Sequence, residues 1–133
     1  VHDFIRERCE QVGMIDYDGK VEFAFFDWPI LVDVAGTFDE NRFMFNGEQV
    51  SKEFLRQWYK ANQPEWIEAV EAAKATGVED WQERCEVKPV HLPPELCTLV
   101  SRMYMSGANR YIGRQVFDSP PLEKVMEDIR PYR

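Results

Sequence analysis

Positive charge and long apolar runs are the two features that this sequence has least of. Its 133 residues include 16 Lys and Arg against 24 Asp and Glu, a net charge of −8, and the basic residues are dispersed. Nucleic acid binding usually requires a clustered basic surface. No apolar run approaches the ~18 residues of a membrane-spanning helix, and no signal peptide is recognisable. We therefore expect a cytoplasmic protein with no nucleic-acid partner and no membrane segment.

Zinc ligands and phosphate loops are scarce as well. The three cysteines, Cys9, Cys85 and Cys97, are odd in number and form no CxxC pair, and His2 and His91 are isolated from them in sequence. This pattern indicates reduced thiols and argues against a zinc site. Neither a GxxxxGK nor a GxGxxG motif occurs, so the sequence contains no recognisable phosphate loop.

What the sequence does contain is a hairpin pattern between residues 18 and 42. Two runs of β-branched and aromatic residues, 21–26 and 30–34, flank Asp27-Trp28-Pro29. Such runs on either side of a turn predict an antiparallel hairpin. Because side chains alternate across a strand, Lys20 and Glu22 share one face. The opposite face is predicted to pack on the core and carries Val21, Phe23 and Phe25.

Two carboxylates of this hairpin form a candidate metal site. A suitable register would bring Asp33 beside Glu22, with Lys20 alongside. Mg²⁺ usually takes one or two protein carboxylates and completes its octahedron with water and phosphate oxygens, so the pair suits a Mg²⁺ that also holds phosphates. The alternative is that these charges form only the solvated face of a strand. The following loop favours the metal site, because Asp33 leads into a Gly-containing loop closed by Arg42, and binding residues concentrate on such loops.

These residues resemble the SAICAR synthetases (phosphoribosylaminoimidazole-succinocarboxamide synthases) of purine biosynthesis. That family has a glycine-led strand with a Lys-x-Glu-Phe motif, a hydrophobic strand ending in Asp, and an Asp-x-x-Arg loop followed by an aromatic residue. The matching segments are Gly13-Met14-Ile15, Lys20-Val21-Glu22-Phe23, Leu31-Val32-Asp33 and Asp39-Glu40-Asn41-Arg42-Phe43. Leu92-Pro93-Pro94-Glu95-Leu96 is similar to the start of the family's C-terminal helix. The departures are Gly19, Ala24, Val34 and a loop that is one residue longer.

The resemblance implies an ATP-dependent ligase that joins a carboxyaminoimidazole ribonucleotide (CAIR) to L-aspartate through an acyl phosphate. It implies Mg²⁺ on Glu22 and Asp33, and catalytic and substrate-binding roles for Lys20 and Arg42. Asp39 would orient Arg42 or receive the amino group of aspartate, or else is only a turn residue. The ATP phosphate loop and adenine pocket would belong to a preceding half, on the same or a separate chain, so the segment alone is expected to be inactive. A homo-oligomer remains open.

The predicted fold is α+β, with an antiparallel hairpin or small sheet followed by packed helices, as in the C-terminal part of a SAICAR synthetase-like, ATP-grasp-related fold. Residues 13–45 would carry the site, and residues 51–133 would be mainly helical, after an Asn46-Gly47 hairpin turn. A helical pattern runs from residue 94 to about residue 117. Two alternatives stay open: an inactive acidic helical interaction module whose aromatic-rich middle is recognised by a partner, and another ATP-grasp-type carboxylate–amine ligase.

Overall fold

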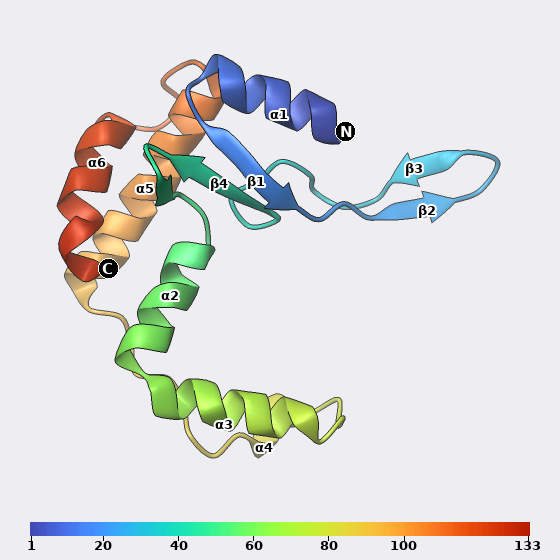
Figure 1. Cartoon of the computed structure of the whole chain (residues 1–133), viewed down its shortest axis with the longest axis vertical. Helices are drawn as coiled ribbons and strands as arrows, with labels where there is room; N and C mark the ends of the chain where they lie inside the picture. Colours follow the sequence, from blue (N-terminus) through green and yellow to red (C-terminus); the bar gives the residue numbers. More distant parts are fainter.

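The computed structural model describes all residues from 1 to 133 and has an α+β fold, as predicted (Figure 1). Five short strands lie in the first half, and every element from residue 53 onward is helical. In chain order the elements are α1 (His2–Gln11), β1 (Ile15–Gly19), β2 (Phe23–Phe25), β3 (Pro29–Leu31), β4 (Asn41–Phe45), β5 (Glu48–Gln49), α2 (Glu53–Asn62), α3 (Pro64–Ala75), α4 (Trp81–Arg84), α5 (Pro94–Ile112), α6 (Leu122–Ile129) and the 3₁₀ helix η1 (Arg130–Tyr132).

A three-stranded antiparallel sheet in the order β1-β4-β5 forms the centre of the molecule. The predicted Asn46-Gly47 turn joins β4 to β5, with φ of 50° and 80°. These positive φ values are those that Asn and Gly tolerate best, which is why this pair makes a tight hairpin. Between β1 and β4 the register shifts between Asp16 and Asp18. This bulge places Asp16 in the interior and leaves Asp18 on the surface, although regular alternation would put both on one face.

The core lies where the sheet meets α1, α5 and α6. Phe43 of β4 is fully buried and stacks on Tyr111 of α5, with ring centroids 5.6 Å apart. Phe38 meets Phe43 edge-on at 5.3 Å and Tyr104 at 5.7 Å. Burying one such ring stabilises the fold by about 1.5–3 kcal/mol. The buried apolar cluster comprises Ile5, Cys9, Met14, Phe38, Phe43, Phe45, Val50, Phe54, Leu96, Met103, Leu122, Val125, Met126 and Ile129.

The ends of the helices follow from local chemistry. Pro64 begins α3 at the first helical position, as expected of a residue with no N–H to satisfy. α5 ends at Ile112, earlier than the helical pattern indicated, because Gly113 has a left-handed φ of 81°. The chain then doubles back, and the N–H groups of Val116 and Phe117 both donate to Asn109 Oδ1. Apolar residues beyond the glycine therefore continue the pattern without continuing the helix.

The predicted hairpin forms, but it does not pack on the core. β2, β3 and the turn between them, residues 23–31, project from the body as an arm (Figure 1). Phe25, Phe26 and Trp28 are 77%, 79% and 68% exposed. The prediction that Val21, Phe23 and Phe25 face the core is wrong. Alternation shows which side chains share a face, but it does not show whether another element covers that face.

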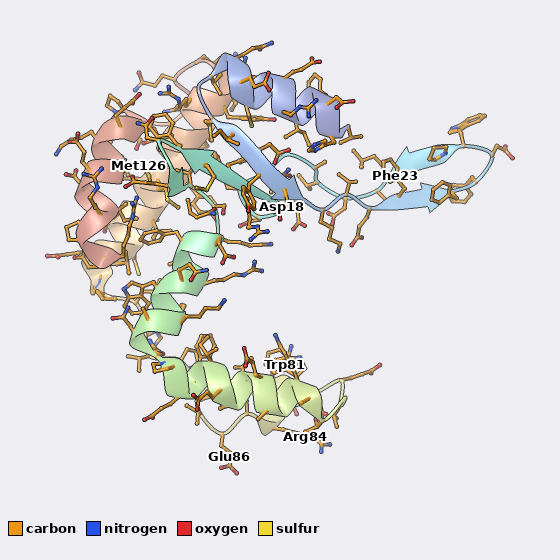
Figure 2. All side chains as sticks on the ribbon, in the orientation of Figure 1. Asp18, Phe23, Trp81, Arg84, Glu86 and Met126 are labelled. Carbon is orange, nitrogen blue, oxygen red and sulfur yellow. The ribbon has the colours of Figure 1, made fainter.

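The molecule is open in shape. The arm and the α3–α4 pair extend toward the same side, whereas α5 and α6 lie together on the other side (Figure 1). Figure 2 shows Asp18 near the root of the arm, Phe23 out on the arm and Trp81 far away beside α3. No helix is both long and apolar enough to cross a membrane.

Candidate anion-binding cleft

A polar cleft of about 420 Å³ lies between the end of β1, the start of β4 and the first turns of α2. It contains three of the five predicted site residues, Lys20, Asp39 and Arg42. No hydrophobic residue lines it, which distinguishes it from the predominantly apolar pockets that hold most drug-like ligands. Its lining includes four cationic side chains and three acidic ones, in a chain whose net charge is −8. The residues are Asp18, Gly19, Lys20, Asp39, Glu40, Asn41, Arg42, Lys52 and Arg56.

Arg42 is held in one orientation by two neighbours. Its Nε donates to Asp18 Oδ1 at 2.6 Å, and its Nη2 donates to Asp18 Oδ2. The guanidinium carbon lies 5.1 Å from the centre of the Tyr17 ring. The hydrogen bonds from Arg42 hold the pKa of the Asp18 carboxyl below its usual value. Nη1 donates to no protein group, so one edge of the fork stays free for a carboxylate or phosphate.

Lys20 is a charged ammonium surrounded by acidic groups. It forms an ion pair with Glu22, and the hydrogen bond with that carboxylate is the main cause of its raised pKa. The negative charges of Glu22, Glu40 and Asp33 raise the pKa further. The backbone N–H of Lys20 donates to Glu40 C=O at 3.1 Å, which fixes the end of β1 beside the loop. Lys20 thus joins the cleft to Glu22, one of the two predicted metal ligands.

Glu22 and Asp33 lie at the root of the arm and do not line the cleft. The N–H of Val32 donates to Glu22 C=O at 3.0 Å, so Glu22 faces Val32, and Asp33 comes one residue later. The register that would pair Glu22 with Asp33 is therefore not formed. Asp33 Oδ1 accepts a hydrogen bond from the Val34 N–H at 2.7 Å. No group of three or more His, Cys, Asp and Glu side chains gathers in a way that could hold a metal ion.

Asp39 stands between the polar cleft and an apolar pocket. It accepts a hydrogen bond from the Tyr104 hydroxyl at 2.9 Å. Burial, together with this carboxylate, raises the pKa of Tyr104 well above its ordinary value, so the phenol remains a donor. The second pocket, about 320 Å³, lies against α5 and includes Phe38, Tyr104, Tyr111 and Phe117. Asp39 lies in a turn and is exposed, and the Tyr104 hydroxyl of α5 holds its side chain.

Sequence reasoning missed four charged cleft residues, Asp18, Glu40, Lys52 and Arg56. The signals for two of them were present. Lys52 and Arg56 are four residues apart where a helix was predicted, a spacing that places both on one face. Lys52 lies 3.7 Å from Glu40 and Arg56 lies 3.3 Å from Glu53. Asp18 is two residues before Lys20, but the bulge in β1 made its face unpredictable from alternation alone.

Comparison with known proteins identifies the family. A model of the SAICAR synthetase family matches residues 1–73. An Archaeoglobus fulgidus protein provisionally named phosphoribosylaminoimidazole-succinocarboxamide synthase is 38% identical over 132 residues, which are 98% of this chain and 38% of that protein. The phosphoribosylaminoimidazole-succinocarboxamide synthase of Thermoplasma acidophilum is 27% identical over 124 residues, which are 86% of this chain and 40% of that protein.

The fold and the cleft together define an α+β unit with clustered cations and carboxylates in one polar cleft. The chain belongs to the SAICAR synthetase family. This confirms the resemblance drawn from the strand and loop motifs between residues 13 and 45. The chain spans about two fifths of the length of the curated relatives it matches.

Proposed function

We propose that this chain forms part of an ATP-dependent ligase that joins the carboxylate of CAIR to L-aspartate, with SAICAR, ADP and phosphate as products. The observation that carries the proposal is the cleft itself. Lys20 directly follows β1, Asp39 lies in a loop and Arg42 belongs to β4, yet all three line one polar cavity. The names of the two relatives supply the reaction, and the charges of the cleft fit its anionic reactants.

The chemistry explains why cations are needed. A carboxylate is a poor acyl donor, so its oxygen first attacks the γ-phosphorus of ATP, and ADP leaves. The ammonium of aspartate then gives one proton to solvent, the resulting amine attacks the acyl carbon, phosphate leaves, and the nitrogen gives a second proton to solvent. Negative charge moves between phosphate and carboxylate oxygens in each step, and fixed cations stabilise it with little reorganisation.

Each cation of the cleft has a distinct role in this proposal. Arg42 offers its free edge to a carboxylate or to the ribose phosphate, in a plane fixed by Asp18 and Tyr17. Lys20 acts as a mobile point charge on a transferring phosphate or on a substrate carboxylate. Lys52 and Arg56 close the opposite side of the cleft from α2. Asp39 receives the ammonium of aspartate, because its Tyr104 contact leaves one carboxylate oxygen without a bond from that hydroxyl.

We propose that Mg²⁺ is held by Glu22 and Asp33, which requires the root of the arm to change register when the ion binds, because here Glu22 faces Val32 and Asp33 comes one residue later. Both are acceptor-only oxygen ligands, and Glu22 pairs with the cation Lys20. Two carboxylates without a third ligand suit Mg²⁺, which keeps several waters and takes its remaining oxygens from phosphates. When bound, the ion would neutralise charge on the ATP phosphates. Lys20 remains the residue of this chain that lies between these carboxylates and the cleft.

The remaining parts of the ATP site would come from a preceding half, in an ATP-grasp-related arrangement. We propose that this half covers the arm, whose apolar side chains are exposed. A two-stranded hairpin is at best marginally stable alone in water, and a covering element would supply its stability. An inactive interaction module is the second candidate, and the exposed arm offers it a binding surface in addition to the aromatic-rich middle that the sequence indicated. The two candidates differ in one respect: the ligase needs the charged residues of the cleft, and the interaction module does not.

The test is product formation by the whole enzyme, with the 133-residue chain measured in parallel. The whole enzyme is expected to release ADP and SAICAR only when ATP, CAIR and L-aspartate are all present. The 133-residue chain alone is expected to give neither. Release of ADP with a different amine and not with aspartate would replace the proposal by another carboxylate–amine ligase. Absence of turnover by the whole enzyme would favour the interaction module.

A further inference from the structure

Asp16 is a buried carboxylate that neither the cleft nor the proposed chemistry uses. Its side chain is fully buried, at 0% exposure. Oδ1 accepts a hydrogen bond from Asn41 Nδ2 at 2.9 Å. Oδ2 has no hydrogen-bond partner, and His2 Nδ1 lies 3.4 Å away from it. A buried carboxylate with an unsatisfied oxygen is costly, so its presence calls for a role beyond packing.

The carboxylate dictates which way the Asn41 amide points. Asn41 Oδ1 accepts a hydrogen bond from the Gly36 N–H at 3.0 Å, and its Nδ2 donates to Asp16. Asp16 Oδ1 accepts from Nδ2, so the amide nitrogen points toward Asp16 and the amide oxygen is left for the Gly36 N–H. An apolar residue at position 16 would leave the amide of Asn41 with a buried donor and no partner.

Asn41 in turn closes the loop that carries Asp39. Its side chain holds Gly36, and its backbone N–H donates to Thr37 C=O at 2.9 Å. Asn41 therefore ties the end of the loop 36–41 to its start. Asp39 lies inside this closed loop, and Arg42 follows directly after it.

Gly19 gives independent evidence that the Asn41 side chain is tightly packed. A Cβ built at Gly19 would lie 2.1 Å from Asn41 Nδ2 and 2.5 Å from Asn41 Cγ. Any side chain at position 19 would therefore displace the amide. Gly19, which departs from the family pattern, leaves room for Asn41 from the surface, while Asp16 holds the same amide from the interior.

We propose that Asp16 is a positioning residue, which acts through Asn41 to hold the loop 36–41 so that Asp39 and Arg42 face the cleft. The inference deepens the proposed function and rests on it for its effect on substrate. The brace itself, Asp16–Asn41–Gly36, is a property of the loop and can be measured without turnover.

The experiment compares four variants of the whole enzyme. Asp16→Leu removes the acceptor at similar size, and Asp16→Asn keeps one acceptor oxygen. Gly19→Ala displaces Asn41 from the surface, where folding is less at risk. Asp3→Asn is the control, since Asp3 is exposed and contacts only Arg6. The two readouts are hydrogen exchange at the Gly36 and Asn41 N–H groups and steady-state kinetics with each substrate varied.

For Asp16→Leu and Gly19→Ala we expect loop exchange to quicken and KM for CAIR or aspartate to rise, each by roughly tenfold or more, with a smaller fall in kcat. Asp16→Asn should stay within about threefold of the wild type, because its oxygen can still accept from Asn41. Asp3→Asn should match the wild type in both readouts.

The proposal is overturned if Asp16→Leu folds with unchanged loop exchange, or if Asp16→Asn is as impaired as Asp16→Leu. Should Asp16→Leu not fold, Gly19→Ala decides, and unchanged exchange and KM in that variant would refute the brace. A wild-type enzyme without turnover would refute the proposed function only, because the exchange measurement still reports on the brace.

Discussion

Arg42 and Lys20 carry similar charge but are held in opposite ways. Asp18 and Tyr17 fix the plane of the Arg42 guanidinium, whereas Lys20 contacts Glu22 at the end of a flexible stem. A fixed plane suits recognition of a bound anion, and a mobile point charge suits charge that develops during transfer. Substitutions of the two residues should therefore have different effects on KM and kcat.

Arg42→Lys in the whole enzyme keeps the charge but loses the planar fork. We expect KM for the substrate that Arg42 binds to rise roughly tenfold to a hundredfold, with kcat less affected. The measurement is steady-state kinetics with ATP, CAIR and aspartate varied in turn. An unchanged KM for all three substrates would remove Arg42 from the cleft's function. A thermal melt should stay close to that of the wild type, since the side chain is 41% exposed.

Lys20→Met keeps most of the stem and deletes the ammonium. If Lys20 stabilises charge that develops during phosphoryl transfer, kcat should fall much further than KM rises. The same three-substrate kinetics measure this split. A rise in KM for one substrate with kcat unchanged would show that Lys20 only binds that substrate. A collapsed melting temperature would show instead that the Lys20–Glu22 ion pair is structural.

At this scale the sequence was informative where close spacing along the chain decides proximity. Lys20 and Glu22, two residues apart, do form an ion pair. Lys52 was out of reach, because its position in the cleft depends on how α2 packs beside β4. The burial of Asp16 depends on the bulge that follows it, and no residue type in β1 predicts that bulge.

At the scale of elements, the contact between α5 and the loop residue Phe38 fixes Asp39 beside Tyr104. Gly107 makes this contact possible, because a Cβ there would lie 2.6 Å from Phe38 Cζ. From the sequence alone, a glycine inside a helical pattern is expected only to weaken the helix. The structure shows that its missing side chain is where the Phe38 ring packs.

Gly107→Ala sets two effects against each other. Alanine gains about 1 kcal/mol of helix propensity over glycine, but overpacking against a held ring costs about 1–3 kcal/mol. We expect a net loss of about 1 kcal/mol in the free energy of unfolding, measured by urea denaturation. Ser101→Ala, on the exposed face of the same helix, is the control and should be neutral or slightly stabilising. A Gly107→Ala variant more stable than the wild type would show that Phe38 moves freely.

The hairpin illustrates the limit of prediction for an element. Its two strands and its turn follow from residue types, and the structure confirms an antiparallel pair. Its register and its exposure do not follow, because both depend on the surface that the hairpin packs against. The face predicted to be core, with Phe23 and Phe25, is exposed in this chain.

At the scale of the whole molecule, the arm is the surface through which we expect this chain to join the rest of the enzyme. Phe25→Ser with Trp28→Ser should leave the melting temperature of the 133-residue chain unchanged, because both side chains are exposed. The same pair should lower the melting temperature of the whole enzyme, where burying each side chain contributes about 1.5–3 kcal/mol. The isolated chain is thus the matched control for the whole enzyme. Equal effects in both proteins would show that the preceding half does not cover the arm.

The central claim is that one cleft, with a carboxylate pair beside it, brings Mg²⁺, phosphate and substrate together. The most direct test is a crystal structure of the whole enzyme with CAIR, Mg²⁺ and a non-hydrolysable ATP analogue. We predict the ion at about 2.0–2.1 Å from oxygens of Glu22 and Asp33, with a substrate anion on the free edge of Arg42 and within reach of Lys20. An ion held by other residues, or a substrate bound away from Arg42 and Asp39, would contradict the account.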